Sequence, residues 1–222
     1  MLHCPPRPNN AEEDAAWQGR PRSWAGSPAP KVVPWLAAVA LALAGAVALG
    51  MLVDRYEPTR SFFIEDGPVE VLQAALLLGI AGIFAAAFLR SAGSRALFCL
   101  VAAYVCIFAL TREIPRCGSA FSGDGACLTS GWKETIVASA SVLGVLALVL
   151  RPIDWFDASR LSNIRWIWPS LPIVGLLVAA EALESLIYYS EIEEFFELIA
   201  YLYLGVFAFS ILRGTVERRP ST

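Results

Sequence analysis

Charged residues are scarce in this sequence, and histidine is almost absent. Charged residues make up 17% of the 222 positions, whereas soluble domains carry about 25%. The single histidine, His3, excludes His-ligated zinc sites and His-based catalytic triads. The net charge is −3, so the chain lacks the basic surface of a nucleic-acid-binding protein. Hydrophobic residues make up 57%. The composition therefore indicates a membrane protein and argues against a cytosolic enzyme.

Six apolar segments are long enough to cross a bilayer, which takes roughly 20 residues in a helix because the hydrocarbon core is about 30 Å thick. They cover residues 32–53, 69–89, 96–114, 133–150, 169–189 and 194–212. The sequence thus predicts an all-α bundle of about six transmembrane helices over residues 32–212. Residues 1–31 show no periodicity and are predicted to form a disordered tail, and residues 213–222 a short second tail.

Basic residues in short loops set the orientation of such a bundle. With six spans, both termini share one side, and 12 of the 17 Lys and Arg residues fall on that side. We therefore expect both termini to be cytoplasmic and the lipid bilayer to surround the helices.

Two cysteines lie in the predicted outer connection between the third and fourth spans. Cys117 and Cys127 would face an oxidising compartment there. The sequence predicts a Cys117–Cys127 disulfide.

The first span repeats small residues every four positions, at Ala38, Ala42, Ala46 and Gly50. Such a stripe favours close packing of a second helix. The alternative is that alanine simply fills an apolar helix.

Most acidic residues near the outer boundary fit ordinary roles at helix starts. Glu70 follows Pro68 at the third helical position, and Ser190 with Glu193 fits a capping box. Glu181, Glu184 and Glu197 do not fit such roles, because they lie inside predicted spans.

The spacing of these acids predicts that they lie close together. Glu181 is about 12 residues into the fifth span, or about 18 Å from its inner end, and Glu184 is one turn further out. Glu184 and Glu197 flank Ser190 almost symmetrically, so a helical hairpin would place them at similar depth. Tyr188 and Tyr201, each four residues further on, are predicted to donate hydrogen bonds to them.

Arg112 is the predicted counter-charge at this depth, and Glu113 is the next residue. Several carboxylates in a poorly solvated space cannot all ionise, so such a cluster holds a proton or a cation. We expect an acidic pocket in the outer half of the bundle, ringed by the second, third, fifth and sixth spans.

This pattern favours a protein that binds or conducts a proton, a cation or a cationic small molecule at Glu181, Glu184, Glu197 and Glu113, with Arg112 as counter-charge. No cofactor is predicted, and the identity of any metal is left open, although oxygen ligands suit a divalent cation. The alternative is a non-catalytic membrane subunit or scaffold in which these residues fix the bundle. Catalysis is less favoured, because no nucleophile–base pair or phosphate-binding glycine loop is present. A protein partner or a homo-oligomer remains open.

Two further segments, Glu-Asp-Gly-Pro-Val-Glu-Val-Leu at 65–72 and Arg-Glu-Ile at 112–114, each border an apolar span. Together they resemble a group of multi-span bacterial membrane proteins of unknown function, over residues 61–116. The resemblance implies a bacterial inner-membrane location and no particular activity. In that group an aromatic residue and a histidine follow the Arg-Glu pair, whereas this chain has Pro115, Arg116 and Cys117.

Overall fold

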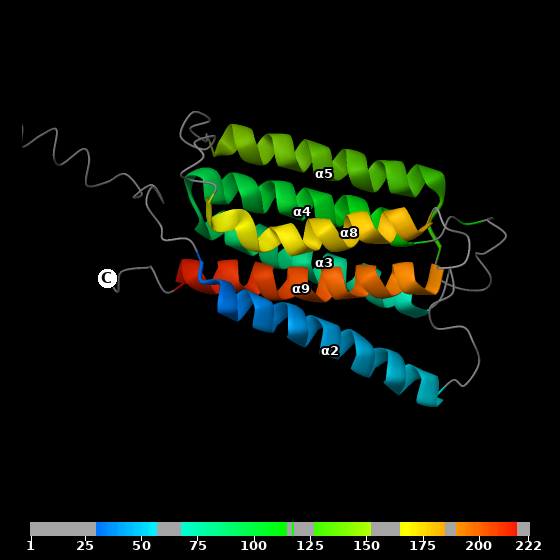
Figure 1. The fold of residues 1–222 in the computed structure, drawn as a ribbon. Helices are drawn as coiled ribbons and strands as arrows, with labels where there is room; N and C mark the ends of the chain where they lie inside the picture. The colour runs from blue at the N-terminus through cyan, green and yellow to red at the C-terminus, as the bar shows by residue number, and fades with distance from the viewer. Residues whose placement is uncertain are drawn as a thin grey trace, which may run out of the picture.

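The fold is an all-α bundle whose long helices run side by side (Figure 1). The computed structural model describes residues 30–56, 68–114, 117, 127–151, 165–184 and 190–216. The helices are α2 (Val32–Tyr56), α3 (Pro68–Arg90), α4 (Gly93–Glu113), α5 (Ser130–Leu150), α8 (Leu171–Glu184) and α9 (Ser190–Val216), and the 3-10 helix η1 (Arg165–Ser170) precedes α8. The predicted fold class is confirmed.

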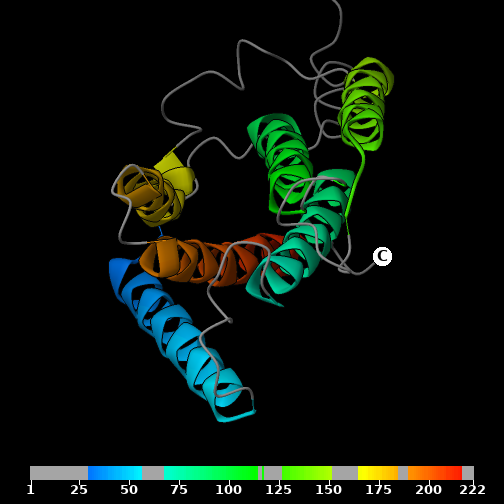
Figure 2. The ribbon, with the colours of Figure 1, turned by 90° about the vertical axis from the view of Figure 1, so that its right-hand side faces the viewer.

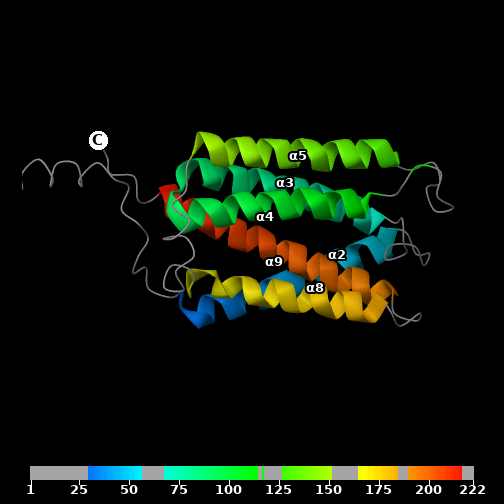
Figure 3. The same ribbon diagram turned by 90° about the horizontal axis from the view of Figure 1, so that it is seen from above.

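Five of the described helices, α2, α3, α4, α5 and α9, are long and apolar enough to cross a membrane. In the fifth predicted span, η1 and α8 follow one another directly and lie along the bundle beside α9 (Figures 1 and 3). The lengths and apolar compositions of these helices thus support the prediction that the protein spans a membrane.

Helix α9 holds the bundle together. It packs against α2, α3 and α8, while α3 packs against α4 and α4 against α5 (Figure 2). The fully buried side chains with the largest volumes come mainly from α9 and α3, and include Tyr203, Phe207, Phe84 and Leu77. Helix α5 buries none of its residues, so it lies at the edge of the bundle.

The small-residue stripe of α2 packs against α9, as expected for a close-contact face. Ala38, Ala42 and Ala46 are all buried, and α9 is the helix that α2 contacts. A Cβ on Gly45 would lie 3.7 Å from Cδ1 of Leu202, which shows how closely the two helices approach.

The predicted disulfide is present. Cys117 and Cys127 are bonded with their Cα atoms 4.9 Å apart, within the usual range for disulfides. The backbone N–H of Cys117 also donates to the carbonyl of Leu128 at 3.1 Å. The disulfide therefore ties the end of α4 to the start of α5.

The start of α2 and the end of α9 lie at the same end of the bundle, which fits an even number of spans (Figure 1). Two arginines at this end satisfy helix carbonyls that have no partner inside their own helix. Arg95 Nη2 donates to the carbonyl of Ile211 at 2.8 Å, and Arg151 donates to the carbonyls of Phe88 and Ser91. Part of the basic charge at this end therefore stabilises the fold.

Candidate functional site

Helices α3 and α9 begin, and α4 and α8 end, at the opposite end of the bundle (Figure 1). Polar and acidic side chains of these helices gather there. We call this the outer end, following the orientation expected from the loop charges. Six residues at this end form what we call the outer cluster: Glu70 and Gln73 on α3, Glu113 on α4, and Glu194, Glu197 and Tyr201 on α9.

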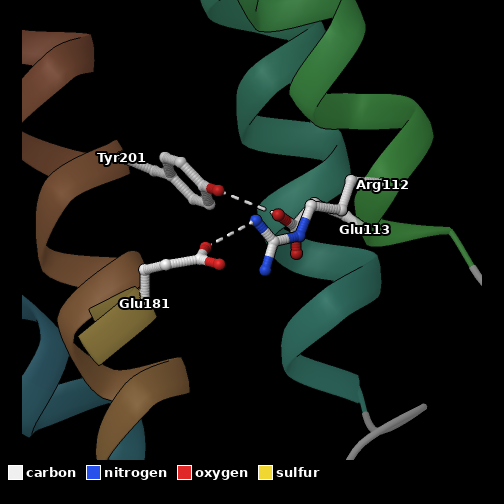
Figure 4. A network of polar contacts seen from close by, with 4 residues as sticks. All are labelled: Arg112, Glu113, Glu181 and Tyr201. Carbon is white, nitrogen blue, oxygen red and sulfur yellow. Dashed lines mark hydrogen bonds and ion pairs between the residues drawn. The ribbon is translucent and has the colours of Figure 1, made fainter. Parts of the chain in front are cut away.

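The centre of the outer cluster is a hydrogen bond between two helices. The hydroxyl of Tyr201 donates to Oε1 of Glu113 at 2.8 Å (Figure 4). Both side chains are buried, and Glu113 is only 7% exposed. The sequence pointed to Glu197 as the acceptor for Tyr201, but the phenol reaches across to α4 instead. This bond joins α9 to α4 at the outer end.

Glu197 is the second buried carboxylate of the cluster, with 8% of its surface exposed. It lies one helical turn before Tyr201 on α9, and its charge acts on Glu113 across the helix interface. Glu194 lies one further turn toward the start of α9, within electrostatic range of Glu197, Glu113 and Glu70. Four carboxylates thus converge where α3, α4 and α9 meet.

Gln73 adds a neutral amide to these carboxylates. It is fully buried, and its Nε2 donates to the backbone carbonyl of Glu194 at 3.1 Å. Because a carbonyl can only accept, this contact fixes which end of the amide is nitrogen. The opposite atom, Oε1, is buried and accepts no hydrogen bond, and the same holds for Oε2 of Glu194. A buried acceptor without a donor is costly, so both oxygens favour a positively charged or hydrogen-donating occupant.

Sequence reasoning did not assign Gln73, Glu70 or Glu194 to the site. It explained Glu70 by its place near a helix start, and Gln73 and Glu194 were not singled out. The signal was the spacing: Glu70 and Gln73 are three residues apart, as are Glu194 and Glu197, so each pair shares a helix face.

Arg112 and Glu181 form an ion pair beside the outer cluster, with Nη1 and Oε2 3.1 Å apart (Figure 4). Their side chains are 54% and 64% exposed, so this pair lies at the edge of the bundle rather than inside it. It links α4 to α8, two helices that are not among the closely packed pairs. The predicted counter-charge thus contacts one of the predicted glutamates, Glu181, and its charge also acts on Glu113.

The depth of Glu181 differs from the estimate made from the sequence. The helical segment begins at Arg165 rather than at residue 169, and its first six residues form the 3-10 helix η1. A 3-10 helix rises about 2.0 Å per residue and an α-helix about 1.5 Å, which places Glu181 about 27 Å from the start of the segment. Counted from Gly93 at the start of α4, Arg112 lies about 28 Å along its helix at the α-helical rise of about 1.5 Å per residue, so the two side chains meet at a similar level.

Two predicted residues lie outside what the structure describes. Glu184 is the last residue of α8, and its side chain is not among those described. Tyr188 falls in residues 185–189, which are outside the described part of the chain. Their proposed pairing, and the equal depth of Glu184 and Glu197, therefore remain predictions.

The outer cluster offers more acceptors than donors. Of its six side chains, only Tyr201 and Gln73 carry a hydrogen-bond donor when the carboxylates are ionised, and Arg112 pairs with Glu181. Within the described ranges, no group of three or more His, Cys, Asp or Glu side chains is placed to hold a metal ion. No protein-family model, curated protein or solved structure matches the chain.

Proposed function

We propose that this membrane protein binds a positively charged occupant, a proton or a small cation, at the outer cluster. The observation that carries the proposal is the convergence of two buried carboxylates, Glu113 and Glu197, with the buried acceptor Oε1 of Gln73. A charged side chain at membrane depth costs roughly 3 kcal/mol on insertion scales, so such groups normally have partners or a function.

The charge balance supports a positive occupant. Glu70, Glu113, Glu194 and Glu197 lie within electrostatic range of one another, and Arg112 is shared with Glu181. Among the described residues at this end, these five carboxylates outnumber the cations, even with Lys133 of α5 counted. A proton or a cation bound at the cluster removes repulsion that the protein's own side chains leave in place.

We further propose that the chain lies in a bacterial inner membrane with both termini in the cytoplasm, so that the outer cluster faces the outside. Two observations support this orientation. Twelve of 17 basic residues fall on the side of the termini, and the Cys117–Cys127 disulfide lies at the other end, where an oxidising compartment would maintain it.

The second candidate is a scaffold in which the Arg–Glu contacts only hold helices together. The Arg112–Glu181 pair favours it, because this contact links two helices that otherwise pack little against each other. The two candidates differ in one respect: a scaffold has no reason to gain stability from an added cation or proton.

The test is the thermal stability of the purified protein in lipid nanodiscs between pH 5 and 9, with and without sodium, calcium, magnesium and manganese. A ligand at 100 times its dissociation constant adds about 2.7 kcal/mol to the stability of the form that binds it. We expect the melting temperature to depend on pH or on one cation in the wild type, and this dependence to disappear in a Glu113→Gln/Glu197→Gln variant.

Glu134→Gln is the matched control. Glu134 is an exposed glutamate on α5 at the same end of the bundle and is not in the outer cluster. This variant should keep the wild-type dependence. Identical melting of the wild type and the double variant under every condition would favour the scaffold and refute the binding site.

A further inference from the structure

We infer that the occupant of the outer cluster is a proton exchanged with the outer side alone, so that the protein binds protons without conducting them through the bundle. This inference rests on the proposed function and narrows it. It has two parts, the identity of the occupant and the absence of a route inward.

The hydrogen-bonding pattern favours a proton. The cluster contains buried oxygens that lack a donor, at Gln73 Oε1 and Glu194 Oε2, beside carboxylates that can take up a proton. A carboxylate that gains H⁺ from outer water becomes a carboxylic acid whose O–H is a donor. The proton returns to the same water when the acid ionises. One proton therefore lowers the negative charge and also supplies a missing donor.

The charged groups around this proton come from every helix packed at the outer end. Helix α3 contributes Glu70, α4 contributes Arg112 and Glu113, α9 contributes Glu194, Glu197 and the phenol of Tyr201, and α8 contributes Glu181. On α5, the Lys133 ammonium donates to the carbonyl of Ile114, next to Glu113 in the chain. Among the described residues the carboxylates at this end outnumber the cations, which favours uptake of a proton.

The interior beyond Tyr201 is apolar. Leu77 and Phe84 of α3, Phe207 of α9 and Cys106 of α4 are buried there and belong to one core. The hydroxyl of Tyr203 is held by the carbonyl of Pro169 at 2.8 Å. Along the described helices, no acidic or basic residue lies between the outer cluster and the level of Arg95 at the other end.

A proton relay through a membrane protein uses a succession of ionisable side chains or water in a polar path. Between their two ends the described helices carry no acidic or basic side chain, and the Tyr203 hydroxyl there is held by the Pro169 carbonyl. The outer cluster is therefore accessible from one side, and the apolar core separates it from the cytoplasmic end.

The experiment combines two measurements on the full chain. The first is infrared spectroscopy of the protein in lipid at neutral pH, which detects the carbonyl stretch of a protonated carboxylic acid. We expect this band in the wild type and in the Glu134→Gln control, and its loss or shift in Glu113→Gln or Glu197→Gln. Sodium, magnesium and calcium should leave the wild-type band unchanged.

The second measurement is the rate at which an imposed pH difference decays across vesicles that contain the protein and an internal pH dye. We expect the same rate as in protein-free vesicles. A faster decay that Glu197→Gln abolishes would overturn the one-sided site and show conduction.

The outcomes separate this inference from the proposed function. Loss of the wild-type band on addition of a cation would identify that cation as the occupant, which refutes the proton but keeps the binding site. Absence of the band, together with melting that no cation changes, would refute both. These wild-type readings do not require any variant to fold.

Discussion

Replacing Tyr201 with phenylalanine tests the central contact of the outer cluster. The change removes one hydroxyl and keeps the ring, which is buried in the core between helices. The lost group donates to Glu113 Oε1 at 2.8 Å, where both side chains are buried. Glu113 would then remain buried without this donor.

The expected cost follows from the nature of this bond. A hydrogen bond to a neutral group contributes about 0.5–1.5 kcal/mol to stability, and one to a charged group about 1.5–3 kcal/mol. The negative charge of Glu113 is only partly balanced, because neighbouring carboxylates share the positive charge near it. The bond therefore falls between these two cases, and we expect Tyr201→Phe to lower the free energy of unfolding by about 1–3 kcal/mol.

The assay is reversible unfolding in mixed detergent micelles, followed by circular dichroism as the denaturing detergent is increased. Tyr104→Phe is the matched control. Tyr104 is a partly exposed tyrosine on α4 whose hydroxyl accepts a 3.3 Å hydrogen bond from Ser141. Its loss should change stability by less than about 0.5 kcal/mol, as for surface substitutions.

A double-mutant cycle with Glu113→Gln isolates the pair, since residues in direct contact show an interaction energy that separate sites do not. Equal, small effects of Tyr201→Phe and Tyr104→Phe would refute the reasoning. An interaction energy of zero between Tyr201 and Glu113 would refute it as well.

Four further variants test the supports of the fold in the same unfolding assay. Arg95→Ala should lower stability by about 3 kcal/mol, because a buried, charge-assisted hydrogen bond to a helix carbonyl is lost. The Cys117→Ser/Cys127→Ser variant should lose about 2.5–3 kcal/mol of stability, which is the chain-entropy value for so short a loop. The wild type treated with a reducing agent should be as stable as this variant. Arg112→Gln and Glu181→Gln should each cost at most about 1 kcal/mol, because their ion pair is exposed.

Each of these predictions has a result that contradicts it. An Arg95→Ala protein as stable as the wild type would show that this contact does not hold the end of α9. A reducing agent without effect on the wild type would contradict the stabilising role of the disulfide. A loss of several kcal/mol in Arg112→Gln would mean that the pair is buried in the membrane protein as it exists in lipid.

Helix positions were predictable because long apolar segments have few alternatives in a membrane. All six predicted spans lie close to observed helices, and the Cys117–Cys127 pairing was expected because both cysteines lie in a predicted outer loop. Which helices pack against each other was harder to predict than where they lie in the sequence. The stripe on α2 predicted a contact face, but nothing in the sequence named α9 as its partner.

The site was only partly predictable, for two physical reasons. The contact of Arg112 with Glu181 was predicted, but the exposure of this pair was not, because it depends on how loosely α8 packs against α4. Gln73 carries no charge, so it did not stand out in the sequence. Its role becomes visible only when α3 and α9 pack together and its amide contacts the Glu194 carbonyl.

The partner of Tyr201 shows the same limit. Spacing along one helix favours Glu197, one turn away, as its acceptor. The hydroxyl instead crosses to Glu113 on α4, because the interface between helices decides which groups face each other. Sequence spacing describes one helix at a time.

The number of protons released when the protein unfolds tests the account most directly. A carboxylic acid that is protonated in the fold ionises in water near neutral pH, because a glutamate in water has a pKa of about 4.3. Unfolding in weakly buffered solution at pH 7 should therefore release about one more proton per molecule from the wild type than from Glu113→Gln/Glu197→Gln. Equal release from the two proteins would contradict a proton held at the outer cluster.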